Sequence, residues 1–271
     1  MAEAVAEFLE FAKNKADVLA NCDMEKCDPG VVAKADYAIV FGGDGTILSA
    51  ASFLRCMSIP VVGVNVGKLG FLAEFSPGEL KAFFSYLDRG EVDIEKRMML
   101  HCSVKSGGKV KFSATAINDI VITAGPPFNM LELCMSVSGQ NLANCTGDGV
   151  IICTPTGSTA YNLSAGGPIL EADIAAIVIT PICPHSLSFR PIVIGAECDI
   201  KVEAVRVNPG TTVIVDGRAH SKLAEGDVVE VQKSDGVFLI VSNPKRTKWD
   251  TLAEKLRWGE KPRYNTERES K

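Results

Sequence analysis

The sequence predicts an α/β domain with a parallel sheet, followed by a β-rich and mostly antiparallel domain. Residues 36–66 contain an apolar segment, then a helical pattern, then a second apolar segment. This order is typical of a strand–helix–strand unit with parallel strands. Beyond residue 93, β-branched and polar residues alternate and glycine-containing turns recur, as in antiparallel sheets. We expect an α/β domain at residues 1–95, a β-rich domain at residues 96–245, and a C-terminal helix and tail at residues 246–271, the helix returning to the first domain.

The α/β domain is predicted to hold three helices and two strands. Residues 2–20 carry apolar side chains at helical spacing and predict an amphipathic helix. DYAIVF at residues 36–41 predicts a buried strand, because this short apolar run ends at two glycines. The other elements are a helix at residues 47–57 that stops before Pro60, a strand at residues 61–66, and a helix from Pro77 to Gly90.

The β-rich domain is predicted from two stretches, residues 98–153 and 174–241. Glycine-containing turns punctuate both, at residues 107–108, 125–127, 147–149, 208–210 and 225–227. A further helix is expected at residues 247–258, with a frayed polar tail at residues 260–271.

Composition excludes several classes of protein. The 271 residues carry a net charge of −5 and no basic block, which disfavours a nucleic-acid partner. No apolar run approaches the roughly 18 residues that a membrane span needs, and the N-terminus lacks a signal-peptide pattern. We therefore expect a cytoplasmic protein without membrane contact.

The nine cysteines show no C-x-x-C spacing and no four-ligand zinc pattern. Cys22 and Cys27 are five residues apart, and Cys183 lies near His185. We expect buried, reduced thiols, as is usual for a cytosolic protein.

GGDGT at residues 42–46 is the first candidate site. Glycines between a strand and a helix allow a ligand to approach the backbone, and the free N–H groups there bind phosphate. Asp44 is unusual in such a loop, because a carboxylate repels phosphate. Its position is reasonable if it faces a hydroxyl that attacks the phosphate, or a magnesium ion; both roles belong to phosphoryl transfer. The alternative is a plain glycine turn with Asp44 as a helix cap.

Two other nucleotide-binding patterns are absent. GVNVGKL at residues 63–69 has one residue too few between its glycines for a P-loop, and a leucine where magnesium needs a hydroxyl. No G-x-G-x-x-G follows a strand, so a Rossmann dinucleotide fingerprint is missing as well.

TPTGSTAYNLS at residues 154–164 is the second candidate site. Its hydroxyls and free N–H groups suit a polar ligand, and Tyr161 could pack on a base; the alternative is an ordinary Ser/Thr-rich helix cap. The pair Asn118 and Asp119 interrupts a strand-like run at residues 114–123. The two side chains reach one ligand only if the strand bends or ends there; alternatively, Asn118 is a bulge and Asp119 faces solvent.

Taken together, these segments resemble the NAD kinase family. The family signatures are similar to GGDGT at residues 42–46, Asn118-Asp119 and TPTGSTAYNLS at residues 154–164, and also to NVGKLGFL at residues 65–72 and PHSLSFRP at residues 184–191. The match runs in order from about residue 31 to residue 245. Lipid kinases and phosphofructokinases share the glycine loop alone, so the narrower resemblance depends on order, spacing and the TGSTAY stretch.

The resemblance implies ATP-dependent phosphorylation of the 2′-hydroxyl on the adenosine ribose of NAD, giving NADP. Asp44 would orient or deprotonate that hydroxyl, and Mg²⁺ would accompany ATP without dedicated protein ligands. Polyphosphate as donor and NADH as acceptor remain alternatives. The remaining implied contacts are backbone contacts to phosphate from Gly42, Gly43 and Gly45, contacts to the NAD ribose and phosphate region from Asn118 and Asp119, and a dinucleotide site lined by Thr159, Ala160, Tyr161 and Ser164.

The resemblance also implies a homodimer or homotetramer, because Asp148 is similar to a family residue that reaches the nicotinamide end of a neighbouring subunit's ligand. Two features depart from the family pattern. Members usually begin with a strand and a phosphate-contacting turn, whereas this chain starts in the first helix, and Thr146 stands where many members carry a basic residue. His185, Arg190 and Lys68 receive no assigned role.

Two alternative functions differ in class from an NAD kinase. A lipid kinase of the diacylglycerol type would favour an apolar acceptor groove and membrane contact, against which the acidic charge argues. A non-catalytic NAD(P) sensor could dispense with the carboxylate, yet Asp44 is present.

Overall fold

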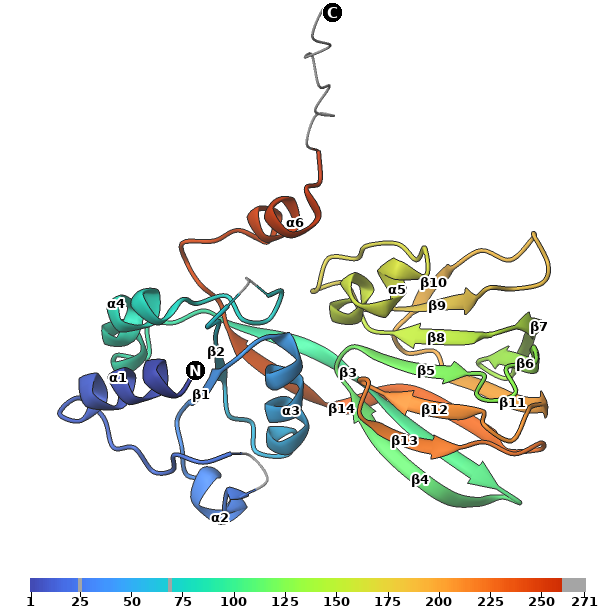
Figure 1. Cartoon of the computed structure of the whole chain (residues 1–271), viewed down its shortest axis with the longest axis horizontal. Coiled ribbons are helices and arrows are strands. Elements are labelled where there is room, and N and C mark those ends of the chain that lie inside the picture. The colour runs from blue at the N-terminus through green and yellow to red at the C-terminus, as the bar shows by residue number, and fades with distance from the viewer. Residues whose placement is uncertain (24–25, 68–69, 260–271) are drawn as a thin grey trace, which may run out of the picture. The chain divides into compact units, whose positions relative to one another are not determined.

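The computed structural model describes residues 1–23, 26–67 and 70–259, so Lys68 and the predicted tail at residues 260–271 lie outside the described residues. The chain forms two units. The first combines Met1–Ala50, Ile59–Glu95 and the C-terminal segment that begins at Ile240, and the second combines Ala51–Ser58 and Lys96–Leu239. Figure 1 shows helices gathered in the first unit and strands in the second.

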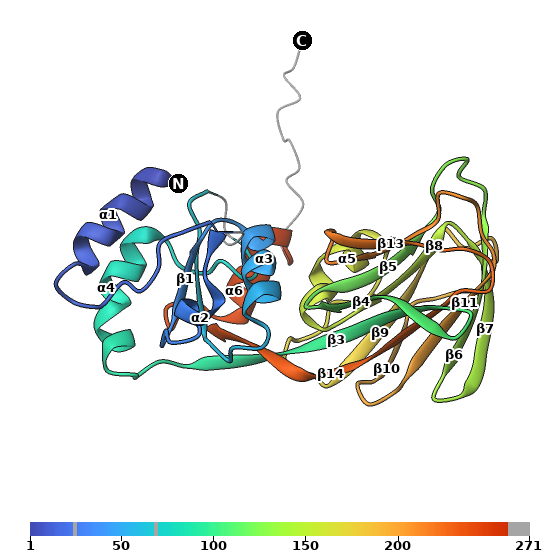
Figure 2. The same cartoon turned by 90° about the horizontal axis from the view of Figure 1, so that it is seen from below.

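The first unit is built on a parallel strand pair, as the sequence predicts. β1 (Ala38–Phe41) pairs with β2 (Val61–Val64), and α3 (Asp44–Leu54) connects them. α1 (Ala2–Ala12) and α4 (Pro77–Asp88) lie side by side on one face of these strands, and α3 lies on the other (Figures 1 and 2). The short α2 (Pro29–Val32) precedes β1, and α6 (Lys248–Leu256) belongs to the same unit.

Helices pack on both faces of the parallel strand pair in the first unit. Phe8 of α1 and Phe84 of α4 meet edge to face, with ring centroids 6.0 Å apart, and pack against Val62 and Val64 of β2. Side chains alternate along a strand, so Gly63 faces the opposite side, where an added Cβ would lie 2.6 Å from Ile47 of α3. The glycine thus allows α3 to pack closely on the sheet.

Two helix predictions differ from the structure in length. The helix predicted at residues 2–20 ends at Ala12, because its buried face consists of Phe8 and Ala12, whereas Val18 and Leu19 are exposed; without packing, a helix of this length has little stability. The helix predicted from residue 47 begins at Asp44 instead. A carboxylate in the first turn is stabilised by the positive end of the helix dipole.

The other predicted boundaries hold closely. The α4 helix begins at Pro77 behind a capping box formed by Ser76 and Glu79. The α6 helix begins after Thr247, which forms a second capping box with Asp250. The strand predicted at residues 61–66 ends two residues earlier, at Val64.

The second unit consists mainly of antiparallel strands, as the sequence predicts, and these strands belong to two sheets. One sheet has the order β10-β9-β8-β5-β12-β13, with bounds Ile192–Gly195, Ala176–Ile182, Gly149–Cys153, Asp119–Thr123, Thr212–Val215 and Ala219–Lys222. The other contains β14, β11, β6 and β7, with β3 pairing β14 and β4; their bounds are Val228–Val241, Ile200–Arg206, Leu131–Val137, Gln140–Gly147, Ile94–Ser106 and Lys109–Ala116. The end of β14 reaches the first unit, where Ile240 pairs with Val61.

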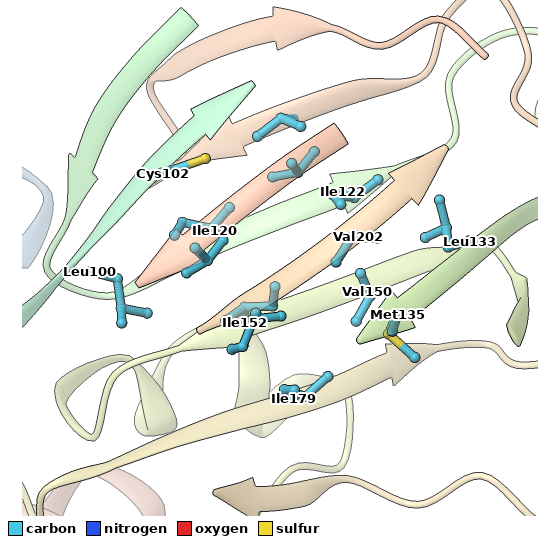
Figure 3. Packing of buried hydrophobic residues seen from close by; sticks show 14 of the residues in the cluster. Leu100, Cys102, Ile120, Ile122, Leu133, Met135, Val150, Ile152, Ile179 and Val202 are labelled. Carbon is cyan, nitrogen blue, oxygen red and sulfur yellow. The ribbon is translucent and has the colours of Figure 1, made fainter. Parts of the chain in front are cut away.

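One hydrophobic core lies between these sheets. Ile120, Ile152 and Ile179 of one sheet and Leu133 and Val202 of the other belong to a single buried cluster, shown in Figure 3. The sheet with β8 at its centre is buried on its second face as well, in a cluster that includes Val121, Ile151 and Val178. Burial on both faces explains why β8 and β9 read as continuous apolar runs.

The expectation of buried, reduced thiols is wrong for four cysteines. A disulfide joins Cys22 to Cys27, whose Cα atoms are 5.7 Å apart, within the range that a disulfide spans. Cys56 and Cys183 are exposed free thiols, whereas Cys102, Cys145 and Cys153 are buried as expected. Among the described residues, no helix is both long and apolar enough to cross a membrane.

Candidate active site

The predicted glycine loop lies between β1 and α3 and exposes its backbone. Gly42 has φ +153°, and a Cβ added to it would lie 2.4 Å from Thr46 Oγ1, so no larger residue fits. The N–H of Gly42 donates to the carbonyl of Val64 at 2.8 Å, which ties the loop to β2. Gly43 and Gly45 are exposed, and nothing lies within 4 Å of an added Cβ at either one. A phosphate can therefore approach the backbone at the head of α3.

Backbone N–H groups hold the Asp44 carboxylate in one orientation. Its Oδ2 accepts the N–H of Phe71 at 2.9 Å, and its Oδ1 accepts the N–H groups of Leu72 at 2.9 Å and Ala73 at 3.2 Å. A helix cap would instead bond N–H groups in the first turn of its own helix, so the cap interpretation does not describe these contacts. A Cβ added to Gly70 would stand 1.9 Å from Asp44 Oδ1, so this close approach requires glycine.

A lysine that the sequence did not single out completes this cluster. Lys255, near the end of α6, places Nζ 3.4 Å from Asp44 Oδ2. The same ammonium lies 4.6 Å from the centroid of the Phe71 ring. The expected return of the C-terminal helix to the first unit is thereby confirmed, and it brings a positive charge to the glycine loop.

The second cluster lies in the second unit, where Asn118 and Asp119 occupy a break between strands. β4 ends at Ala116 and β5 begins at Asp119, so the predicted run at residues 114–123 does divide at this pair. Asp119 is only 6% exposed, which rules out the alternative in which it faces solvent. The carbonyl of Asn118 accepts the N–H of Thr154 at 2.9 Å, which links this break to the second candidate motif.

Asp216 holds the break in place, and the sequence interpretation missed it. Its carboxylate accepts the N–H of Ile117 at 2.8 Å, that of Asn118 at 2.8 Å and that of Asp119 at 3.1 Å. Asp216 and Gly217 form the turn between β12 and β13 with φ of +50° and +67°. Three residues connect the paired Val215 and Ala219, and the N–H of Arg218 closes the turn by donating to the carbonyl of Val215 at 3.0 Å. Asp-Gly is a known signal for turns whose two central residues have positive φ. The Asp-Gly dipeptide could have predicted the turn from the sequence. It could not have predicted that the Asp216 carboxylate binds the N–H groups of residues 117–119.

Asp119 and Asp216, the two carboxyl groups at this break, both have raised pKa values. Burial, and then the nearby Asp216 charge, raise the pKa of Asp119 to about 7. Burial also raises the pKa of Asp216, although the three backbone N–H groups that it accepts act in the opposite direction. Near neutral pH, Asp119 is therefore partly protonated and able to donate a hydrogen bond.

The TPTGSTAYNLS segment follows β8 and packs onto the Asn118 break. It forms a 3₁₀ turn at Thr156–Thr159 and then α5 at Tyr161–Ser164. The hydroxyl of Thr154 donates to the carbonyl of Ile117 and accepts the N–H of Gly157 at 3.0 Å. Thr159 and Ala160 are half-buried, whereas Tyr161 and Ser164 are exposed.

Two buried polar atoms near this contact have no hydrogen-bond partner among the described residues: Asn118 Oδ1 and Thr156 Oγ1. Unpaired buried polar groups are uncommon and call for an explanation, such as a ligand. By contrast, the Asn162 amide has partners for both its oxygen and its nitrogen: it accepts from the Thr180 hydroxyl of β9 at 2.6 Å and donates to the carbonyls of Ser158 and Pro168 at 3.0 Å each. Asn162 therefore ties the segment to β9 and to the loop that follows it.

Asp148 lies away from this cluster. It directly precedes β8, whereas Thr154 directly follows it, so a whole strand of about 17 Å separates them. The N–H of His185 donates to the carbonyl of Thr146 at 2.8 Å, and Arg190 donates to the carbonyls of Leu187 and Phe189. The part of the chain that the structure describes contains no group of three or more potential metal ligands.

The fold and the carboxylate in an exposed glycine loop define a two-domain phosphotransferase. The ATP-NAD kinase N-terminal domain matches residues 7–92, and the ATP-NAD kinase C-terminal domain matches residues 117–243. This chain belongs to the ATP-NAD kinase family, which confirms the resemblance drawn from the motifs.

Relatives and solved structures agree with this assignment. The chain is 39% identical to an NAD kinase of Syntrophotalea carbinolica over 86% of this chain and 81% of that protein. A crystal structure of yeast NADH kinase with NADH is similar at a TM-score of 0.81 and 30% identity, covering 88% of this chain and 71% of that one. An Archaeoglobus fulgidus NAD kinase with ATP is similar at a TM-score of 0.76 and 26% identity, covering 93% and 94%.

Proposed function

We propose that this chain transfers the γ-phosphate of ATP to the 2′-hydroxyl of the adenosine ribose of NAD, giving NADP and ADP. The observation that carries the proposal is the Asp44 carboxylate, held by the N–H groups of Phe71, Leu72 and Ala73 at the head of α3. The family membership and the relatives named NAD kinase support the same reaction.

The glycine loop serves the phosphates. Gly43 and Gly45 expose their backbone at the positive end of α3, where a helix of eleven residues attracts anions, and Gly42 contributes the close approach that a larger residue would block. In the transfer, the 2′-oxygen bonds to the γ-phosphorus while the bond from that phosphorus to the β–γ bridging oxygen breaks. Asp44 orients the hydroxyl and accepts its proton. Because the transition state is loose, positioning contributes more than basicity.

The dinucleotide is held by the cluster in the second unit. Asn118 Oδ1 and Thr156 Oγ1, the two unpaired atoms, supply polar contacts to the sugar and phosphate region. Asp119 adds a carboxyl group that can donate a hydrogen bond when it is protonated. The exposed ring of Tyr161 suits stacking on a base, and the remaining lining residues are Thr159, Ala160 and Ser164.

Magnesium enters this account with the triphosphate, as MgATP. Among the described residues, no group of three or more His, Cys, Asp or Glu side chains could hold a metal ion. Mg²⁺ retains several waters and binds phosphate oxygens in sites of this kind, which needs few protein ligands.

The assembly is proposed to be a homodimer or homotetramer. The support is the position of Asp148, half-buried and a strand's length from the residues of its own dinucleotide cluster. In that position it could contact a ligand held by a second copy of the chain. A cytoplasmic location is proposed as well, because ATP and NAD are both abundant there.

A product assay tests the reaction itself. Purified protein is incubated with MgATP and NAD, and NADP is followed with an NADP-specific dehydrogenase. We expect one ADP per NADP, and a phosphorus NMR spectrum that places the new phosphate on the 2′-oxygen. Diacylglycerol serves as the control acceptor, and polyphosphate and NADH are tried in separate reactions. Tight NAD binding without any product would overturn the proposal in favour of a sensor.

A further inference from the structure

We propose that Lys255 binds the phosphoryl donor: its ammonium lies beside Asp44 and contacts the terminal phosphate of ATP. The inference rests on the proposed function and adds a residue that family motifs and sequence spacing did not indicate. Lys255 and Asp44 are 211 positions apart in the chain. Only the fold of the first unit brings them together.

The helix that carries Lys255 is fixed at its other end. Thr247 and Asp250 close a capping box at the start of α6, and Thr251 and Leu252 are buried. Lys255 follows Thr251 by four positions and Leu252 by three, so it lies on the same face of the helix as these two buried residues. This face turns the ammonium toward the glycine loop, and the Lys255 side chain is only 27% exposed.

The contact with Asp44 leaves the ammonium free to bind a second group. Nζ stands 3.4 Å from Asp44 Oδ2, longer than the 2.7–2.9 Å that is usual for a strong charge-assisted hydrogen bond. The Phe71 ring, 4.6 Å from Nζ, attracts the ammonium without using a carboxylate oxygen. An ammonium has three donors, so it can contact Asp44 and a phosphate oxygen at the same time.

Charge gives this arrangement a function. A triphosphate that binds at Gly43 and Gly45 places its negative charge near the Asp44 carboxylate, and the two repel each other. A cation beside that carboxylate offsets the repulsion and attracts the terminal phosphate. The positive charge is also placed where charge develops on the transferring group, which stabilises the transition state.

The test compares Lys255→Met with wild type by calorimetric titration of MgATP and, separately, of NAD. We expect the ATP affinity to fall roughly 10- to 150-fold, the effect of losing a hydrogen bond to a charged group, with NAD affinity within twofold of wild type. Lys255→Arg, which retains the charge, should recover most of the ATP affinity. Lys248→Met removes the other lysine of the same helix and should leave both affinities unchanged.

A second comparison separates donor binding from mere support of Asp44. In an Asp44→Asn background, the loss of ATP affinity caused by Lys255→Met should persist, because the phosphate contact is direct. If the loss disappears there, or if Lys255→Met lowers kcat with ATP affinity unchanged, the inference is wrong. Should Lys255→Met unfold at the assay temperature, Lys255→Gln is judged by the same two affinities. Absence of NADP formation by wild type would overturn the proposed function, whereas the ATP titrations would still decide the role of Lys255.

Discussion

The carbonyl oxygen of Asn118 occupies the space where a side chain on Gly157 would begin. A Cβ added to Gly157 would lie 2.1 Å from that oxygen, and the N–H of Thr154 already donates to it at 2.9 Å. The glycine of the TPTGSTAYNLS segment is therefore required for close packing against the Asn118 break. Two motifs that are distant in the sequence form one structural unit through this contact.

Gly157→Ala should both destabilise the second unit and weaken NAD binding. The added methyl group must displace backbone atoms, which costs about 1–3 kcal/mol in a packed region. Urea denaturation gives the free energy of unfolding, and calorimetry gives the NAD affinity. Gly78→Ala is the matched control, because nothing lies within 4 Å of its added Cβ. If the Gly157→Ala protein had the stability and the NAD affinity of wild type, the packing account would be wrong.

Asp216→Ala should lower the free energy of unfolding by about 2–3 kcal/mol, because buried N–H groups lose a charged acceptor. NAD affinity should fall with it, since the same N–H groups position Asn118 and Asp119. Asp216→Asn preserves the shape and one acceptor oxygen, so its free energy of unfolding and its NAD affinity should lie between those of wild type and Asp216→Ala. Asp235→Asn removes an exposed carboxylate from the same unit and should change neither quantity. Unchanged NAD affinity in Asp216→Ala would show that the break keeps its shape without this residue.

Asp119 should make stability depend on pH in an unusual direction. Its folded-state pKa is about 7, above the reference value of 3.8, so between these values the folded state binds more protons than the unfolded state. The free energy of unfolding should therefore decrease as pH rises from about 4 to about 7, by up to roughly 1.4 kcal/mol per pH unit.

Urea denaturation of wild type and Asp119→Asn at several pH values between 4.5 and 7.5 checks this expectation. The amide variant cannot ionise at this position, so wild type should lose stability relative to it as pH increases. Parallel pH profiles for the two proteins would show that Asp119 titrates normally.

Gly70→Ala should disturb catalysis without disturbing the dinucleotide cluster. Its new methyl group would stand 1.9 Å from Asp44 Oδ1 and force the carboxylate away from the segment that holds it. Because a displacement of about 1 Å can cost roughly 10²-fold in rate, kcat should fall by that order. NAD affinity should stay near the wild-type value, since Asn118 and Thr156 belong to the other unit. A wild-type kcat would mean that Asp44 does not need this contact.

The sequence predicted those parts of the fold that depend on local pattern. Apolar runs and turn residues identified the parallel pair β1 and β2 and the antiparallel strands, and the glycine loop was placed correctly before α3. Errors occurred where packing decides the outcome: the helix predicted to residue 20 ends at Ala12, and Cys22 is bonded to Cys27.

Long-range contacts explain the site residues that were missed. Asp216 reaches the Asn118 break because β12 pairs with β5, with Val215 opposite Ile120. No local sequence pattern reveals this register. Lys255 reaches Asp44 only through the return of α6 to the first unit. Each is an ordinary residue in its own segment, and its partner lies far away in the chain.

The most direct test of the account is NADP formation by Asp44→Asn. The amide preserves the size of the side chain but cannot accept the proton of the 2′-hydroxyl. We predict a fall in kcat of about 10²- to 10⁴-fold, the usual contribution of a positioned base, with NAD affinity retained. A kcat within tenfold of wild type would contradict the role of Asp44.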